Sequence, residues 1–370
     1  MKMSHKHKKS PQFRSTKEDA FFAASNSERG FCSYYSDCFD NREINRVFVI
    51  KGGPGTGKSR FMREVGENAA ARGWERRMIY CSSDSDSLDG IILRRGETSI
   101  ALLDGTAPHT YEPKSPGVRE EWINLGDFWN ASALRERADE ISVYQQEKQK
   151  GYRVAYRYLS AYGSVYRSRR EKLEPYLRRK ALEAYAKRLM RKIPDGARFE
   201  SETALIGSVG MQGNIRLDTY FAESDCCYEI EDCKGVGAEL MAELYRLAAE
   251  KRLRVRVSRD PILPDLVDGL FLCESRIAFV LGGEVRAQEK ARRIFVRRFL
   301  KISEMGDLRE SVNFDGRMLD ALLGEALEQL QKVRHAHFEL EKIYSSAMDF
   351  AEKEKFTKKF CNRLFDLQNP

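Results

Sequence analysis

Residues 52–59 read Gly-Gly-Pro-Gly-Thr-Gly-Lys-Ser, and their types and spacing could do chemistry on a phosphate. An apolar run precedes them and a helical pattern follows, which is the context of the GxxxxGK[ST] loop. Glycines let backbone amides approach phosphate oxygens, and the helix adds its positive end. We therefore predict that Mg-ATP binds here, with Lys58 on the β- and γ-phosphates and Ser59 on Mg²⁺. The predicted nucleotide-binding residues are Gly52, Gly53, Pro54, Gly55, Thr56, Gly57, Lys58, Ser59 and Arg60.

Asp104 follows the apolar run 100–103 and is the acid that we expect on the neighbouring strand. Such an acid holds the water shell of the metal, so Asp104 and Ser59 form the predicted magnesium site. The alternative is a solvent-facing aspartate in a turn before Gly105. Because Gly105 follows Asp104, the glutamate that many ATPases use for hydrolysis is absent from its usual place.

Further catalytic candidates lie in two loops. The Ser/Asp cluster 82–89 follows a second predicted strand, and its Asp84 and Asp86 could orient a water or accept a hydroxyl proton. A solvated turn has the same composition, so that alternative stays open. His109 lies just beyond the metal acid and could sense the γ-phosphate, although a lone loop histidine can also be incidental. His335 and His337, two apart on a helix, are expected at the surface.

Predicted strands at 46–50, 78–81 and 100–103 alternate with helical segments. This order predicts an α/β fold with the parallel sheet of a P-loop NTPase and helices on both faces. Residues 1–16 are expected to be a mobile basic tail, and residues 17–196 the P-loop domain. That domain ends in a charged helical segment, about 131–193, which Gly163 and Pro175 should divide into two or three helices.

Residues 197–370 are expected to form a second, degenerate P-loop-like domain that repeats the first at a shift of about 180 residues. Gly235 and Gly237 then fall on Gly55 and Gly57, and a helical region at about 285–366 closes this half as one closes the first. At the positions of Lys58, Ser59 and Asp104 the repeat has Ala238, Glu239 and Leu281. Without the lysine, the hydroxyl and the acid, the second half should be structural or regulatory and bind no nucleotide.

Several segments together resemble an uncharacterised bacterial family of P-loop ATPase-like proteins with two tandem P-loop halves. The resemblance covers most of the chain and is carried by residues 51–59, 80–90, 104–109, 116–117 and 123–126, with 337–341 and 347–350 in the second half. It implies ATP binding but no established reaction. The loop at 231–239 departs from the second P-loop of that family, which argues against a two-site mechanism.

The basic residues are concentrated in one segment. Residues 147–192 contain fifteen Lys and Arg but four Glu, whereas the whole chain has a net charge of +8. Tyr158, Tyr162 and Tyr166 form a stripe within this segment, and aromatic rings in a basic face can bind nucleic acid, here through residues 148–192. The alternatives are packing of the tyrosines between helices, or a lid whose arginine reaches the γ-phosphate.

The composition of the chain indicates where in the cell the protein works. No run approaches the roughly 20 apolar residues of a membrane helix, and the N-terminus has no secretory signal. The eight cysteines include no CxxC pair and are expected to be reduced thiols, so we predict a cytoplasmic protein without a membrane partner. The preferred function is a magnesium-dependent ATPase (a hydrolase) or an ATP-driven switch. A small-molecule or nucleotide kinase and a nucleic-acid-associated NTPase are the alternatives.

Overall fold

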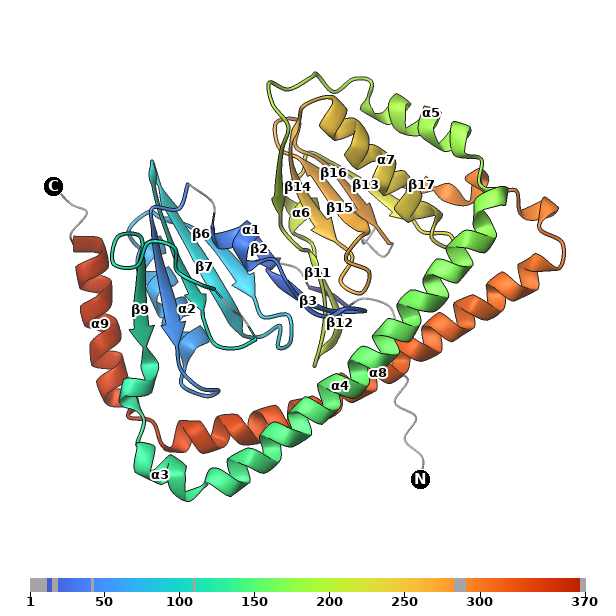
Figure 1. The fold of residues 1–370 in the computed structure, drawn as a ribbon. Coiled ribbons are helices and arrows are strands. Elements are labelled where there is room, and N and C mark those ends of the chain that lie inside the picture. Colours follow the sequence, from blue (N-terminus) through green and yellow to red (C-terminus); the bar gives the residue numbers. More distant parts are fainter. Residues whose placement is uncertain (1–11, 15–18, 41–42, 109–110, 283–290, 367–370) are drawn as a thin grey trace.

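The computed structural model describes residues 12–14, 19–40, 43–108, 111–282 and 291–366, and it contains two six-stranded sheets (Figure 1). The first sheet has the order β2-β6-β7-β8-β5-β9 and the second the order β10-β14-β15-β16-β13-β17. The strands of the first are β2 (Asp19–Phe22), β5 (Arg46–Lys51), β6 (Glu75–Tyr80), β7 (Leu88–Arg95), β8 (Thr98–Asp104) and β9 (Glu120–Asn124). Those of the second are β10 (Glu200–Thr203), β13 (Cys226–Glu231), β14 (Arg254–Arg259), β15 (Val267–Leu272), β16 (Ile277–Leu281) and β17 (Ala291–Phe295).

The register supports the predicted repeat. Ile50 of β5 pairs with Asp104 of β8, and Ile230 of β13 pairs with Leu281 of β16. Since Ile50 and Ile230 are 180 positions apart, Leu281 occupies the place of Asp104 as predicted. Two α/β sheets with one strand order therefore follow each other along the chain.

The prediction of a parallel sheet needs correction, because both sheets are mixed. β7 runs antiparallel to β6 and to β8, and β15 does the same in the second sheet. The tight turn at Gly96 and Glu97 joins β7 to β8, and so short a connection allows only antiparallel neighbours. β7 is absent from the predicted strands because its first residues, Leu88 and Asp89, belong to the Ser/Asp cluster 82–89, whose composition is that of a loop.

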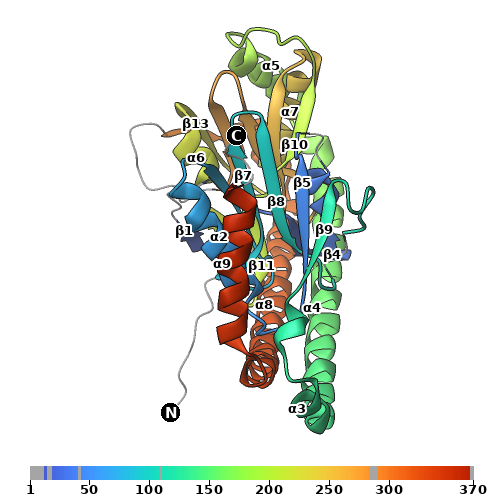
Figure 2. The same ribbon diagram turned by 90° about the vertical axis from the view of Figure 1, so that its left-hand side faces the viewer.

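Helices cover both faces of each sheet. The outer face of the first sheet packs against α2 (Lys58–Ala70) and α9 (Phe350–Asp366), which Figure 2 shows side by side. The outer face of the second packs against α7 (Val236–Glu250) and α5 (Arg179–Met190). The two inner faces share one core with the short helices α1 (Tyr35–Phe39) and α6 (Thr219–Glu223).

Two long antiparallel helices extend from the first sheet to the second along one side of the molecule (Figure 1). After α3 (Ala131–Glu136), α4 (Ala138–Leu173) leaves the first sheet, and α8 (Leu308–Ser346) returns from the second. The expected break at Gly163 is absent, because α4 continues through it and the glycine instead leaves room for Glu28. The break at Pro175 is confirmed by η2 (Glu174–Tyr176). None of the described helices is long and apolar enough to cross a bilayer.

Each half also has a hairpin that reaches the other half. The hairpins are β3 (Ala24–Ser27) with β4 (Gly30–Ser33), and β11 (Gly207–Gly210) with β12 (Gly213–Leu217). β1 (Gln12–Arg14) pairs with β12, so these three residues of the predicted mobile tail are a strand; residues 1–11 and 15–16 lie outside the described part. The remaining 3₁₀ turns are η1 (Leu125–Phe128), η3 (Val296–Phe299) and η4 (Ile302–Glu304).

Phe360→Ala tests whether α9 belongs to the first core. Phe360 is 3% exposed, and its ring centroid lies 5.0 Å from that of Phe48 and 5.3 Å from that of Phe61. Removing the ring should destabilise the protein by about 3–5 kcal/mol, because it leaves a cavity. Phe314→Ala, at a side chain that is 53% exposed, should change stability by less than about 0.5 kcal/mol. Equal falls in thermal midpoint for both variants would contradict this assignment.

Candidate functional site

The glycine-rich loop 52–57 joins β5 to α2 at the edge of the first sheet where Asp104 also ends β8. Gly55 and Gly57 have φ of +70° and +79°, conformations that side chains rarely adopt. Gly57 is the N-cap of α2, so the first amides of that helix point out of the loop. A helix start with positive-φ glycines before it is a site for anions.

Lys58 folds back over the loop. Its Nζ donates to the carbonyl oxygens of Gly52 and Gly53, at 2.9 and 2.8 Å, and lies 3.5 Å from Oδ2 of Asp104. Both charged side chains are largely buried, at 13% and 12% exposure. The solvent-facing alternative for Asp104 is therefore wrong. The two side chains meet because β5 and β8 are neighbours in the sheet, which brings residues 46 positions apart to one edge.

Ser59 and Arg60 lie in the first turn of α2 and differ in their surroundings. The Ser59 hydroxyl accepts a hydrogen bond from the Leu88 amide at 2.9 Å, which orients it at the start of β7. Arg60 is two-thirds exposed and donates to Glu64 and Glu354, at 2.7 and 3.2 Å. It borders the same cavity as the loop, but its described partners are carboxylates.

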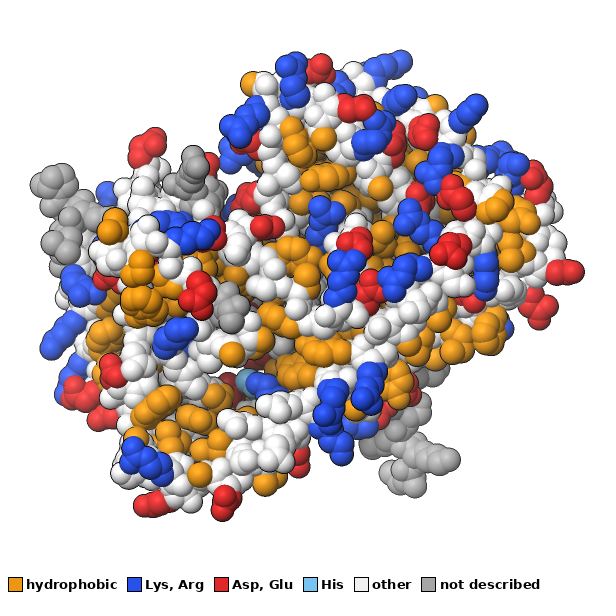
Figure 3. Space-filling view, in the orientation of Figure 1, with side chains coloured by type: hydrophobic (Ala, Val, Ile, Leu, Met, Phe, Trp, Pro, Cys, Tyr) orange, Lys and Arg blue, Asp and Glu red, His pale blue; other side chains and the backbone are white. Residues whose placement is uncertain are grey.

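A cavity of about 1480 Å³ opens in front of residues 54–60. In the space-filling view the surface is hollowed between the part built on the first sheet and the arm formed by α4 (Figure 3). Its far wall is one face of α4 together with the end of α8. The lining includes Asp84, Asp89, Asp104, Lys148, Tyr152, Arg153, Tyr156, Arg157, His337, Glu341 and Phe350.

The acids of the 82–89 loop divide into two groups. Asp84 is 8% exposed, borders the cavity, and accepts hydrogen bonds from Ser87 at 2.8 Å and from Gln212 of the second half. Asp86 does not reach the cavity lining, because it is exposed and pairs with Arg14 at 3.3 Å. Asp89, which is absent from the predicted catalytic residues, is 4% exposed and borders the cavity. His109 lies outside the described residues.

Asp89 could have been found from the repeat. Gly90 pairs with Leu103, and Gly269 pairs with Val280, so Asp89 and Asp268 hold equivalent positions. Asp-Gly thus recurs at one place in both halves. Burial beside the Asp89 charge also raises the pKa of the Cys81 thiol well above its ordinary value, which makes that thiol a neutral part of the wall at neutral pH.

The cavity face of α4 carries aromatic and basic side chains. Tyr152 and Tyr156 stack with ring centroids 5.9 Å apart, and Arg153 and Arg157 flank them. Lys148, whose pKa burial lowers, lies 3.4 Å from Nδ1 of His337. His337 is therefore not the surface residue that its spacing suggested. These residues bring positive charge opposite the glycine-rich loop, as the lid alternative requires.

The tyrosine stripe predicted for nucleic acid packs inside the molecule. Tyr166 is 9% exposed, and Tyr158 and Tyr162 pack against a cluster that includes Leu323 and Leu330 of α8. The interpretation of these tyrosines as packing between helices is therefore confirmed, and they do not form an aromatic face for nucleic acid. The reason is that α4 must present apolar positions to α8 along its length.

The equivalent loop of the second half is closed. The carboxylate of Asp232 accepts hydrogen bonds from the amides of Gly235 and Gly237, at 2.9 and 2.7 Å. A side-chain anion thus takes the amides that would face a phosphate. Glu239, at the position of Ser59, pairs with Arg170 and Arg179, at 2.5 and 3.5 Å. The space in front of this loop is about 20 Å³.

Comparison with known proteins found no relative of this chain. No protein-family model, no curated protein and no solved structure matches this chain. The interpretation of the site therefore rests on the residues themselves and on their geometry.

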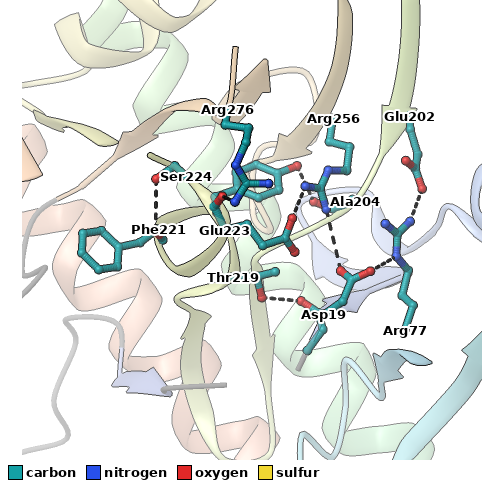
Figure 4. Close-up of polar contacts among 12 residues, drawn as sticks. Asp19, Arg77, Glu202, Ala204, Thr219, Phe221, Glu223, Ser224, Arg256 and Arg276 are labelled. Atoms are coloured by element: carbon teal, nitrogen blue, oxygen red, sulfur yellow. Dashed lines mark hydrogen bonds and ion pairs between the residues drawn. The ribbon is translucent and has the colours of Figure 1, made fainter. Parts of the chain in front are cut away.

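A second cavity, of about 600 Å³, lies between the two halves (Figure 4). Arg77 of β6 donates to Asp19 at 2.6 Å and pairs with Glu202. Arg256 of β14 pairs with Glu223 and lies 3.7 Å from Asp19. These arginines and acids neutralise one another across the two halves, so the network joins the sheets rather than offering a free anion site.

Arg77→Met should destabilise the protein by about 3 kcal/mol, because it leaves Asp19 and Glu202 without this guanidinium partner in a largely buried place. Arg254→Met, an exposed arginine of the same cavity, should have little effect. Chemical denaturation of both variants measures the difference. If Arg77→Met is as stable as the wild type, the network does not hold the halves together.

Proposed function

We propose that this protein binds Mg-ATP at one site, the loop 52–59 of the first half, and hydrolyses it in a cycle that moves the helical parts. The observation that supports this most is the meeting of Lys58, Ser59 and Asp104 at a helix start that borders a large cavity. Membership in the P-loop family is part of the proposal, as is a cytoplasmic location. All eight cysteines are free thiols, which fits a reducing compartment.

The donor set suits magnesium bound with a nucleotide. Magnesium in such sites takes one hydroxyl, phosphate oxygens and waters, and a nearby carboxylate holds a water. Ser59 would supply the hydroxyl and Asp104 the carboxylate, while Lys58 would neutralise phosphate charge beside them. When bound, the metal would withdraw charge from the phosphates. The described parts of the chain contain no group of three His, Cys, Asp or Glu side chains that could hold a metal. A magnesium site of this kind does not need such a group, because phosphate oxygens and waters supply most of the ligands.

Hydrolysis requires a water in line with the bond between the γ-phosphorus and its bridging oxygen. That water would add its oxygen to phosphorus as ADP leaves, and its proton would pass to a base or to solvent. Asp84 and Asp89 are buried acids that border the cavity and could orient it. Arg153 or Arg157 would close over the transferred group from α4.

Phosphoryl transfer to a small molecule is the second candidate, and the size of the cavity favours it. At about 1480 Å³ the cavity exceeds the roughly 300–1,000 Å³ of a typical ligand site. The space beside Tyr152 and Tyr156 would then hold an acceptor. Phosphate release from ATP alone by the purified protein supports hydrolysis, whereas turnover only after addition of a nucleoside or nucleotide acceptor supports the kinase.

Lys58→Ala should weaken binding of a non-hydrolysable ATP analogue with Mg²⁺ at least tenfold, or about 1.4 kcal/mol, because the charge at the β- and γ-phosphates is lost. Calorimetry should give one equivalent for the wild type, since Asp232 closes the second loop. Lys359→Ala, at an exposed lysine of α9, is the control. Unaltered binding by Lys58→Ala, or a stoichiometry of two, would contradict the assigned site.

Asp104→Asn should reduce the stimulation of nucleotide binding by Mg²⁺ far more than it reduces metal-free binding. The substitution keeps the shape of the side chain but removes the charge that holds the metal's water. Asp86→Asn is the matched control, because Asp86 does not reach the cavity lining. Titrations with and without Mg²⁺ measure both. The same Mg²⁺ dependence in Asp104→Asn and the wild type would move the metal role to Asp84 or Asp89.

A further inference from the structure

Lys353 brings a second ammonium group to the glycine-rich loop. It lies one turn into α9, and its Nζ is 3.2 Å from the position that a Cβ on Gly57 would take. Phe350, at the start of α9, lies 3.7 Å from the same position and borders the cavity. Lys353 is separated from Lys58 by almost 300 residues of sequence and by the whole second half.

The environment of this ammonium is unfavourable for a cation. Lys353 is 1% exposed, and within the described chain its Nζ has neither a hydrogen bond nor a carboxylate within 4 Å. Its Nζ lies beside Gly57, the N-cap of α2, which is the positive end of a helix. Burial lowers the pKa of Lys353, with attraction from Glu64 a smaller opposing effect.

A role in packing does not account for these facts. Lys353 is 1% exposed, and a methionine would fill the same buried space without a charge to bury. Burying an unpaired ammonium group costs desolvation free energy, unless a bound anion compensates the charge. Lys58 follows the N-cap of α2 directly and Lys353 lies beside it, so two ammonium groups are close to one positive helix end, where an anion of several charges would be favoured.

We propose that Lys353 is a second phosphate-binding lysine, which the C-terminal helix supplies to the site of the first half. The inference rests on the proposed function, because its ligand is the polyphosphate chain of the same nucleotide. Lys58 would bind the phosphates from α2 and Lys353 from α9, so the bound nucleotide holds the two helices together.

This arrangement links the nucleotide to the long helices. Ser345, at the end of α8, donates to the Gly55 carbonyl at 3.1 Å, and the Tyr344 ring would lie within 3 Å of a Cβ on Gly53. The turn from α8 to α9 therefore lies on the loop itself. Nucleotide binding at Lys353 would order this turn, and α8 would carry the change toward the second sheet.

Lys353→Met tests the proposal, with Lys359→Met as control and Lys353→Arg as the variant that keeps the charge. Affinity for a non-hydrolysable ATP analogue with Mg²⁺ should fall at least tenfold in Lys353→Met, be unchanged in Lys359→Met, and be retained better in Lys353→Arg than in Lys353→Met. Without nucleotide, the thermal midpoint of Lys353→Met should equal or exceed that of the wild type, since the buried charge is gone. A residue needed only for packing would give the opposite pattern.

A measurement on the wild type keeps the proposal testable if Lys353→Met does not fold. Amide hydrogen exchange in the first turns of α9 should slow when the analogue saturates the site. The role of Lys353 would be overturned if Lys353→Met bound the analogue with the affinity of the wild type. It would also be overturned if the wild type bound the analogue without any change of exchange in α9. Either result would leave the loop site intact. Failure of the wild type to bind any nucleotide would instead overturn the proposed function.

Discussion

The packing of α4 against α8 is the contact on which the rest of the structure depends. Apolar side chains such as Leu159 of α4 and Leu330 of α8 bury one another along the pair. Because each long helix leaves one sheet and ends at the other, α5 covers the second sheet and α9 covers the first. Each core thus contains a helix from the opposite half of the chain, and neither half is complete without the other.

The same exchange builds the candidate site from distant parts of the sequence. α4 carries Arg153 and Arg157 to the cavity, and the end of α8 lies on the glycine-rich loop. The hairpin β11–β12 also contributes, since Met211 donates its amide to the Ser83 carbonyl at 2.8 Å and supports the acid-bearing loop. In return, the Ser25 hydroxyl of β3 donates to the Pro261 carbonyl at 2.9 Å in the second half. Under the proposed function, exchange of the bound nucleotide would alter contacts in both halves.

The two halves share one strand order, but the electrostatics of their equivalent loops differ. The first loop faces open space and has Lys58 beside it, so its positive helix end is available to an anion. The second loop has satisfied the same amides with Asp232, and Arg170 and Arg179 are paired with Glu239. The fold tolerates both solutions because the glycines and the helix start are kept, while the charged side chains decide what binds.

The sequence by itself determined the local features: three strands, the helix after the glycine-rich loop, the repeat, and the juxtaposition of Lys58 with Asp104. These follow from hydrophobic periodicity, glycine conformation and strand ends, which depend on neighbours along the chain or on one strand pairing. Only the tertiary structure decided that β7 is antiparallel, that the stripe of Tyr166 is core, that Asp86 points away, and that His337 and Lys353 lie beside the loop. Those outcomes depend on how α4, α8 and α9 pack across hundreds of residues. Helical periodicity shows which face of a helix is apolar, but the element that packs against that face is selected by the whole fold.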